Sequence, residues 1–338
     1  MRVASGLVSS PEVTAELAAS AVRQALEKAE LEQAASVLLF LTRDFQRHAQ
    51  AAVLAAARTA GCLQVAGCTA SGVFTEAGWR TDQPAVAALV LGPPAGKPTS
   101  NGLRLSFSGH SRLPYDWQSD QPRAGLLDSE ATTWSHGRID PSAQSDLLLD
   151  GLHAHPIVCP GLRPLGDAHT VETSAGYDLQ RLGGHAAADS LLRAVPPDVR
   201  ERPPLHALAL SRGEGLPAIS LLSINGDGSL TLADEIEAGD QLTWCMRQPL
   251  YAESEMRSAL TAAVHEQKRP KFGLMFSCIG RGPLFYGNED RDLQAFVESF
   301  PDLPLIGAYG TGQIVPTAQA NHLFHNTALT VLFESADV

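Results

Sequence analysis

One segment of this chain occurs twice: residues 37–91 recur, in looser form, as residues 273–333. Each copy opens with an apolar run typical of a buried strand, continues through a helical stretch, and reaches a second apolar run ending in Gly-x-x-x-(Ser/Thr)-Gly. Three pairs of positions correspond: Gly67 and Gly307, Ser71 and Thr311, and Gly72 and Gly312. We therefore expect an α/β (mixed α+β) fold in which two pseudo-repeated strand-helix-strand-strand halves pack together, with an inserted middle region.

Two halves of this kind suggest where a ligand would bind. The turns after their strands can face one shared cleft. Ligands favour strand ends and domain junctions, because these leave concave surface with exposed backbone N–H groups. The cleft between the halves is therefore the expected binding site.

Length and charge narrow the class of protein. A chain of 338 residues is long enough for two coupled domains or one duplicated domain. The formal charge of −12 argues against a nucleic-acid-binding surface, which needs a basic face. The longest apolar stretch near the N-terminus is too short to span a bilayer and lies too far in for a secretory signal. We expect a cytoplasmic protein without nucleic-acid or membrane partners.

Local patterns predict most of the secondary structure. Helices are expected where apolar residues recur at helical spacing, and strands where runs are continuously apolar or alternate with polar residues. The expected helices cover residues 13–29, 44–60, 142–150, 184–194, 252–267 and 289–300. Outside the second copy, the expected strands cover residues 37–41, 63–67, 85–91, 103–107, 218–224, 229–232 and 241–246. Frequent Pro and Gly predict a long ordered loop over residues 151–166.

The second copy contains a glycine-rich insertion that the first copy lacks. After its first strand the chain reads Ser277-Cys-Ile-Gly-Arg-Gly-Pro283 and continues as a loop to Asn288. Glycines on both sides of Arg281 allow close approach of the backbone, while the guanidinium offers a fork of donors. This combination suits an anionic or carboxylate-bearing ligand.

Several short motifs together resemble a known family. The runs Phe276-Ser-Cys-Ile-Gly-Arg-Gly282, Pro304-Leu-Ile-Gly307, Gly310-x-Gly312-x-Ile314-x-Pro316 and His325-Asn326 resemble the C-terminal part of FIST domains. The run Val65-Ala-Gly-Cys-Thr-Ala-Ser-Gly-Val73 resembles their N-terminal part. The resemblance covers roughly residues 35–333 and implies a FIST N-terminal domain over residues 1–220 and a FIST C-terminal domain over residues 221–338.

The resemblance implies a sensory module for small ligands, often proposed to be amino acids or related metabolites. FIST domains commonly sit beside signalling output domains. Since this chain ends soon after its last expected strand, we expect a standalone protein that passes its signal to a separate output protein. Some relatives are described as haem-binding nitric oxide sensors, which makes haem binding the alternative. Where the family usually has a glutamate, this chain has Gln313, so its ligand preference can differ.

The expected function is binding of a small polar, amino-acid-like or carboxylate metabolite between the halves, in signal transduction. Arg281 would pair with the anion, Ser277, Tyr309 and Gln313 would orient polar groups, and the turns at Gly67 and Gly307 would supply backbone donors. The full set of candidate ligand-binding residues is Gly67, Cys68, Ser71, Gly72, Ser277, Cys278, Arg281, Gly307, Tyr309, Gly312, Gln313, His325 and Asn326.

The cysteines leave a catalytic alternative open. Five scattered cysteines without a Cys-x-x-Cys pair fit reduced thiols. Cys278 is the best nucleophile candidate, because Arg281 stands three residues later and a nearby cation lowers a thiol pKa. No base is placed beside Cys278 by any visible spacing, so a small buried residue is favoured over a catalytic one, and an enzyme is not the favoured class.

The histidines suggest metal or haem sites only weakly. His322 and His325 would form a metal pair if their segment were helical, and His153, His155 and Cys159 would do so in an extended loop, but neither set has a clear further ligand. Candidate axial haem ligands are His48, His185 and His325. We expect no metal and no bound cofactor, with haem as the exception to test.

Overall fold

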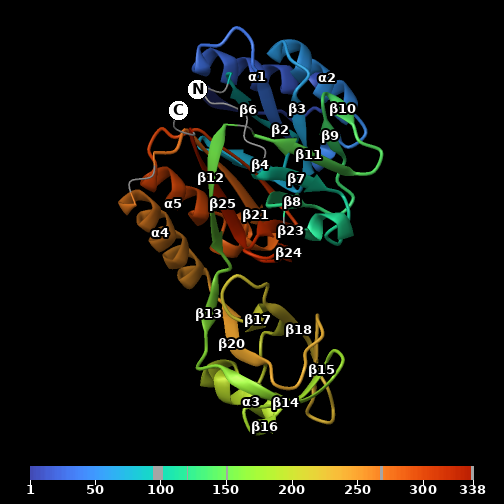
Figure 1. The fold of residues 1–338 in the computed structure, drawn as a ribbon, viewed down its shortest axis with the longest axis vertical. Coiled ribbons are helices and arrows are strands. Elements are labelled where there is room, and N and C mark those ends of the chain that lie inside the picture. The colour runs from blue at the N-terminus through green and yellow to red at the C-terminus, as the bar shows by residue number, and fades with distance from the viewer. Residues whose placement is uncertain (94–101, 120, 150, 267–268, 336–338) are drawn as a thin grey trace. The chain divides into compact units, whose positions relative to one another are not determined.

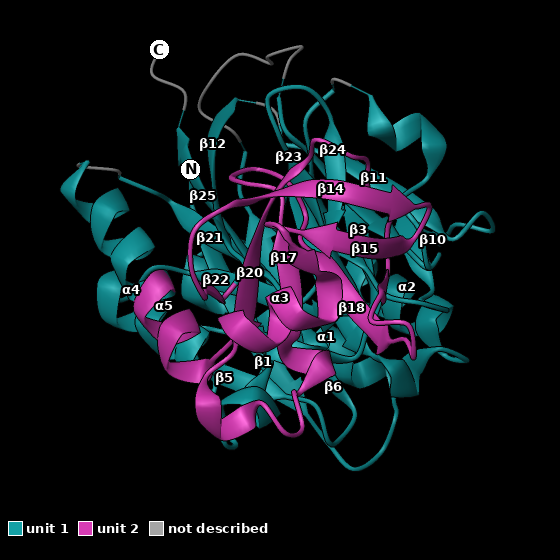
Figure 2. Cartoon of the chain, turned by 90° about the horizontal axis from the view of Figure 1, so that it is seen from below, with its two compact units in different colours: residues 1–160, 256–338 teal, residues 161–255 magenta. Residues whose placement is uncertain are grey.

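The computed structural model describes residues 1–93, 102–119, 121–149, 151–266 and 269–335. Its contacts divide the chain into unit 1, residues 1–160 and 256–338, and unit 2, residues 161–255 (Figures 1 and 2). Helices and strands are mixed in the chain, which confirms the predicted α+β class. The predicted boundary at residue 220 concerned the two family domains and stays a prediction.

The first sheet of unit 1 holds the first copy of the repeated segment. Its strand order is β1 (Val3–Ser9), β6 (Ala85–Leu91), β2 (Ser36–Thr42), β3 (Val65–Ala70), β9 (Thr133–Ser135) and β10 (Arg138–Ile139). Strands β2 and β3 are parallel, and β6 runs antiparallel to β2. The helices α1 (Ala15–Ala29) and α2 (Ala49–Ala60) pack on this sheet, with Gly61 ending α2 in the left-handed conformation.

The second sheet of unit 1 is built in a corresponding way around the second copy. Its order is β12 (Leu152–Cys159), β25 (Ala328–Ser335), β21 (Phe272–Cys278), β22 (Leu305–Gly310), β4 (Gly72–Thr75) and β5 (Gly78–Arg80). Strands β21 and β22 are parallel, and β25 is antiparallel to β21. Strand β4 directly follows β3 in sequence, yet it pairs with β22. The duplication itself stays a prediction.

A third sheet and two helices complete unit 1. The sheet has the order β11 (Gln144–Leu148), β7 (Arg104–Ser108), β8 (Arg123–Leu127), β23 (Gly312–Pro316) and β24 (Asn321–Phe324). Helix α5 (Arg291–Ser299) packs on the second sheet, as does the part of α4 (Pro249–His265) that belongs to unit 1. Short 3₁₀ turns occur at residues 43–45, 115–118, 279–281 and 283–286.

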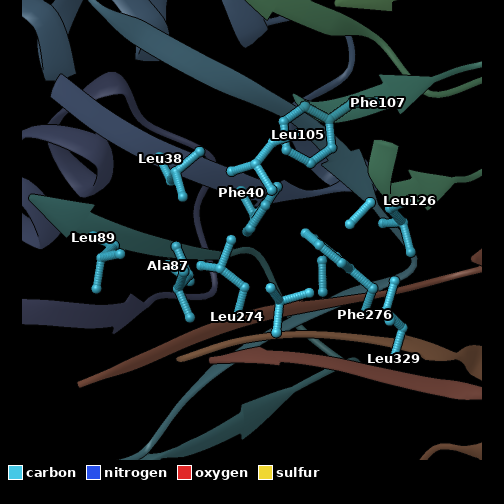
Figure 3. Packing of buried hydrophobic residues seen from close by; sticks show 14 of the residues in the cluster. Leu38, Phe40, Ala87, Leu89, Leu105, Phe107, Leu126, Leu274, Phe276 and Leu329 are labelled. Carbon is cyan, nitrogen blue, oxygen red and sulfur yellow. The ribbon is translucent and has the colours of Figure 1, made fainter. Parts of the chain in front are cut away.

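The central core of unit 1 lies between its sheets. Alternate residues of β2 point to opposite sides, so Leu39 packs under the helices while Leu38 and Phe40 enter the central core. Figure 3 shows Phe40, Phe107 and Phe276 meeting there from three sheets, with ring centroids 5.3 to 6.0 Å apart. Strands buried on both faces explain the continuous apolar runs in the sequence.

Unit 2 is a closed antiparallel barrel. Its strands are β13 (Leu162–Pro164), β14 (His169–Ala175), β15 (Asp178–Leu182), β16 (His185–Ala186), β17 (Leu208–Ser211), β18 (Ile219–Ile224), β19 (Leu230–Leu232) and β20 (Gln241–Arg247). The order β20-β14-β15-β19-β18-β17 returns to β20, which closes the ring. Helix α3 (Ala187–Ala194) contributes Ser190, whose hydroxyl accepts a 3.1 Å hydrogen bond from the indole of Trp244; 3₁₀ turns follow at residues 197–199 and 205–207.

Three local predictions are wrong. The helix expected at residues 142–150 is the strand β11, although residue 150 lies outside the described residues. The loop expected at residues 151–166 contains β12 and β13. Strand β12 lies at the edge of its sheet, where Pro156 is tolerated because its missing backbone N–H is not needed on the outer side. Helical spacing from Met256 and Leu260 predicts that Val264 faces inward on α4, but Val264 is 43% exposed. The expected end of that helix at residue 267 lies outside the described residues.

Candidate functional site

The two corresponding positions Ser71 and Thr311 meet at one place in unit 1. Ser71 lies between β3 and β4, and Thr311 lies between β22 and β23. The backbone N–H of Ser71 donates to the carbonyl of Tyr309 at 2.9 Å, and that of Thr311 donates to the carbonyl of Leu127 at 2.9 Å. The hydroxyl of Thr311 also accepts from the N–H of Ser129 at 3.4 Å. The ends of the two strand pairs therefore converge on the segment that follows β8.

A buried carboxylate lies at this convergence. Asp128 is 1% exposed and accepts two hydrogen bonds from the guanidinium of Arg43, at 3.1 and 2.6 Å, and one from the hydroxyl of Ser71 at 3.1 Å. Burial raises the pKa of Asp128, and the bonds from Arg43 and Ser71 partly offset that rise. The pKa of Cys68 is raised by its burial and by the charge of Asp128, so this thiol stays protonated at neutral pH.

Cys278 lies on the other side of Thr311. Its sulfur is 4.0 Å from the carbonyl oxygen of Thr311 and 3.8 Å from Oδ1 of Asn326. Both oxygens can accept a hydrogen bond from the thiol, but neither is a base that would remove its proton. His325 is exposed, and its Nδ1 lies 2.8 Å from the same carbonyl of Thr311. The fully buried Gln313 satisfies its amide within the protein: with the amide oxygen toward Cys278, its nitrogen donates to two carbonyls of the residues 324–327.

Arg281 is the centre of a buried ion pair. Its side chain is 1% exposed, and Nε and Nη2 donate to the two carboxylate oxygens of Asp292 at 2.8 and 3.0 Å. Nη1 donates to the carbonyl of Cys159 at 2.5 Å, and the hydroxyl of Tyr286 donates to Asp292 at 3.0 Å. The predicted contact of Arg281 with a ligand stays a prediction. Within the protein, its guanidinium donates hydrogen bonds to Asp292 and to the carbonyl of Cys159.

A second buried carboxylate adjoins this ion pair. Asp290 is 4% exposed, accepts from the hydroxyl of Tyr309, and caps α5 by accepting from the N–H of Leu293 at 2.9 Å. Burial, reinforced by the charge of Asp292, raises the pKa of Asp290 to about 6. Tyr309 itself packs its ring against Phe74, with centroids 4.7 Å apart.

The raised pKa of Asp290 predicts how stability depends on pH. Because the folded state binds this proton more tightly than the unfolded state, the contribution of Asp290 to stability rises as the pH falls from about 6 towards the ordinary aspartate value of 3.8. Asp290→Asn keeps a capping side chain and removes the titration. We expect urea unfolding at several pH values to show a flatter profile between pH 4 and 6 for this variant. An unchanged profile would show that Asp290 titrates normally.

A cleft of about 470 Å³ opens beside Ser71, here called the Ser71 cleft. Its lining combines an indole, hydroxyls, an amide, a carboxylate and apolar groups, and it consists of Ser71, Trp79, Thr81, Asp82, Ile279, Pro283, Leu284 and Asn288. The lining residues from Ser71 to Asp82 lie in or beside β4 and β5, and those from Ile279 to Asn288 lie in the glycine-rich insertion. The cleft therefore joins parts of both copies of the repeated segment.

The structure places the predicted residues at different depths. Of the predicted set, Ser71 lines the Ser71 cleft, whereas Cys278, His325 and Asn326 surround Thr311. Gly67 and Gly307 are not in turns but inside β3 and β22, each paired with strands on both sides. The remaining predicted positions are buried: Cys68, Gly72, Ser277, Arg281, Tyr309, Gly312 and Gln313. Whether any of these residues binds a ligand stays a prediction.

Sequence reasoning missed Arg43, Asp128, Trp79 and Asp82. The only sequence signal for Asp128 was its position directly after the apolar run of β8. Nothing in the sequence connected this aspartate with Arg43. Trp79 and Asp82 stand in the stretch between β4 and β6, where no sequence motif marks them.

The histidine and cysteine candidates do not form a metal site within the described part of the chain, where no three His, Cys, Asp or Glu side chains converge for one. His322 lies in strand β24 rather than in a helix, and His155 of β12 contacts Glu334 at 2.9 Å. His48, His185 and His325 are exposed, and none of them lines the Ser71 cleft. Haem binding stays a prediction. No described helix has the length and apolar character needed to cross a bilayer.

Comparison with known proteins finds relatives that match different shares of this chain. An uncharacterized protein of Mycobacterium tuberculosis strain H37Rv is 27% identical over 98% of this chain and 100% of its own length. An uncharacterized protein of Mycobacterium bovis is 27% identical over 55% of this chain and 52% of its own length. A shorter stretch, 19% of this chain, is 41% identical to 15% of F-box only protein 22 of Pongo abelii.

A family model matches the second part of the chain. Residues 187–316 match the FIST C domain, which is a family of sensory domains in signal transduction. The match includes the glycine-rich insertion and the run from Pro304 to Pro316 on which the resemblance was based. Residues 187–316 thus match the FIST C domain, in agreement with the resemblance seen in the sequence.

Proposed function

We propose that this protein is a cytoplasmic sensory protein that binds a small polar, amino-acid-like metabolite in the Ser71 cleft. The observation that carries the proposal is that this cleft joins Ser71, at the end of β3, to the insertion that follows β21. Its volume of about 470 Å³ suits a small metabolite. Hydroxyl, amide and carboxylate groups would orient polar atoms, and Trp79, Ile279 and Leu284 would contact an apolar part.

Arg281 has a supporting role in this proposal. Its ion pair with Asp292 holds the turn at residues 279–281 against α5, and that turn contributes Ile279 to the cleft. The ligand would then be oriented by the lining residues rather than by Arg281. A change in the cleft on binding would be read by a separate output protein.

Native mass spectrometry of the protein purified from its own host tests this proposal. We expect a retained small mass, and we expect that ligand to raise the melting temperature without turnover. Leu284→Ala removes an 83% exposed side chain that lines the cleft, so it should weaken binding about tenfold at unchanged stability. Leu63→Ala, at a position that is 69% exposed and outside the cleft, is the matched control. Equal affinities of both variants and the parent protein would refute the site.

A further inference from the structure

We propose that the ligand carries an ammonium group, which sits on the face of Trp79 where two cavities share this residue. This inference rests on the proposed function of the Ser71 cleft and names the chemical class of its ligand. A second cavity of about 380 Å³ adjoins the cleft, and both are lined by Trp79 and Asn288. The indole of Trp79 therefore borders both cavities, which are together called the groove below.

The charged residues of this groove are all acidic. Its lining includes Glu76, Asp82, Glu289, Asp290 and Glu298, and among the described lining residues there is no lysine, arginine or histidine. A groove with carboxylates on both sides of an aromatic ring favours a ligand with an ammonium group and disfavours an anion that lacks one.

Three of these carboxylates form no ion pair within the part of the chain that the structure describes. Glu76 accepts from the hydroxyl of Ser5 and from the N–H of Leu305, which are neutral donors. Asp290 also accepts from neutral donors, as described above, and Asp82 is exposed with no hydrogen-bond or ion-pair partner among the described residues. Glu289 and Glu298, in contrast, are paired with arginines outside the lining.

Trp79 is the accessible aromatic surface among the tryptophans of the chain. The other three tryptophans, Trp117, Trp134 and Trp244, are at most 3% exposed, whereas Trp79 is half-buried in β5. Its neighbour Arg80 donates to Ser9 at 3.2 Å and to the carbonyl of Trp79 at 2.7 Å and does not line either cavity. An ammonium group over an indole gains cation–π attraction, and nearby carboxylates add to it.

A matched set of probes tests the charge preference. Putrescine and choline carry ammonium groups, 1,4-butanediol is a neutral analogue of putrescine, and succinate is an anionic one. We expect putrescine and choline to bind and to quench the fluorescence of Trp79, with calorimetry confirming the affinity, and we expect no binding of butanediol or succinate. Added salt should weaken the binding.

Variants locate the probe. Trp79→Leu keeps an apolar side chain and should weaken putrescine binding about tenfold, and Asp82→Asn should weaken it about fivefold. Tyr115→Leu and Asp116→Asn, at an exposed aromatic and an exposed acid outside the groove, are the controls and should bind as the parent does.

The outcomes separate this inference from the proposed function. The ammonium assignment would be overturned if butanediol bound as tightly as putrescine. It would also be overturned if Trp79→Leu bound the amines as tightly as the parent protein does. If succinate or a neutral host metabolite binds and is lost on Leu284→Ala while amines fail, the cleft keeps its proposed function and the cation preference is wrong. If neither a host ligand nor any probe binds, both are wrong.

Discussion

Arg281→Ala is expected to lower the free energy of unfolding by about 3–5 kcal/mol, because it leaves a buried carboxylate without its partner. Asp292 is 1% exposed and receives two hydrogen bonds from this guanidinium, and Asp290 lies beside it. Alanine offers no side-chain donor in place of the guanidinium. Urea unfolding followed by circular dichroism measures the loss.

The matched control is an ion pair of the same type at the surface. Arg257 pairs with Glu298, and the two side chains are 39% and 60% exposed. Since exposed pairs contribute little, Arg257→Ala should cost less than about 1 kcal/mol. The double variant Arg281→Met/Asp292→Leu should recover much of the loss of Arg281→Ala, because no unpaired charge remains. A small effect of Arg281→Ala itself would mean that the ion pair is open to water in solution.

The second large effect is expected at Gly67. Gly67→Ala should destabilise unit 1 by about 3–5 kcal/mol, because the new methyl group meets backbone and the residue is also strained. A Cβ at this position would lie 1.9 Å from the carbonyl oxygen of Leu39, and φ is +152°. The neighbouring strand β2 cannot move away without breaking its pairing with β3.

Gly226→Ala provides the comparison for this prediction. A Cβ at Gly226 meets nothing within 4 Å, and φ there is not positive. The same change should therefore alter stability by less than about 1 kcal/mol and can even stabilise by restricting the unfolded chain. Denaturation midpoints of the two variants measure the difference. Equal midpoints would contradict the tight packing of β3 against β2.

Continuous apolar runs made the strands of the two copies predictable. Residues 85–91 were predicted with the bounds that β6 has, because a strand buried on both faces needs apolar residues at every position. The strands that were missed carry weaker patterns. Before β11, Pro141 followed by Ser142 resembles a helix start. In β12, the proline and two histidines suit an edge strand but resemble a loop.

The candidate site was predictable mainly from the correspondence between the two predicted copies. The correspondence of Ser71 with Thr311 pointed to two positions that the structure does bring to one place. The partner of Arg281 was not predictable, because an aspartate eleven residues later carries no recognisable spacing. Whether that arginine would reach a ligand or an internal carboxylate depends on the path of the loop and the position of α5, which the sequence does not encode locally.

The pairing of β4 with β22 has a consequence for the order in which this protein is made. Residues 72–75 leave the ribosome long before residues 305–310, so the edge they complete does not exist while most of the chain is being synthesised. The barrel of residues 161–255 draws all its strands from one continuous stretch and can close in the meantime. The larger unit must therefore keep its early strands from aggregating until the last quarter of the chain arrives.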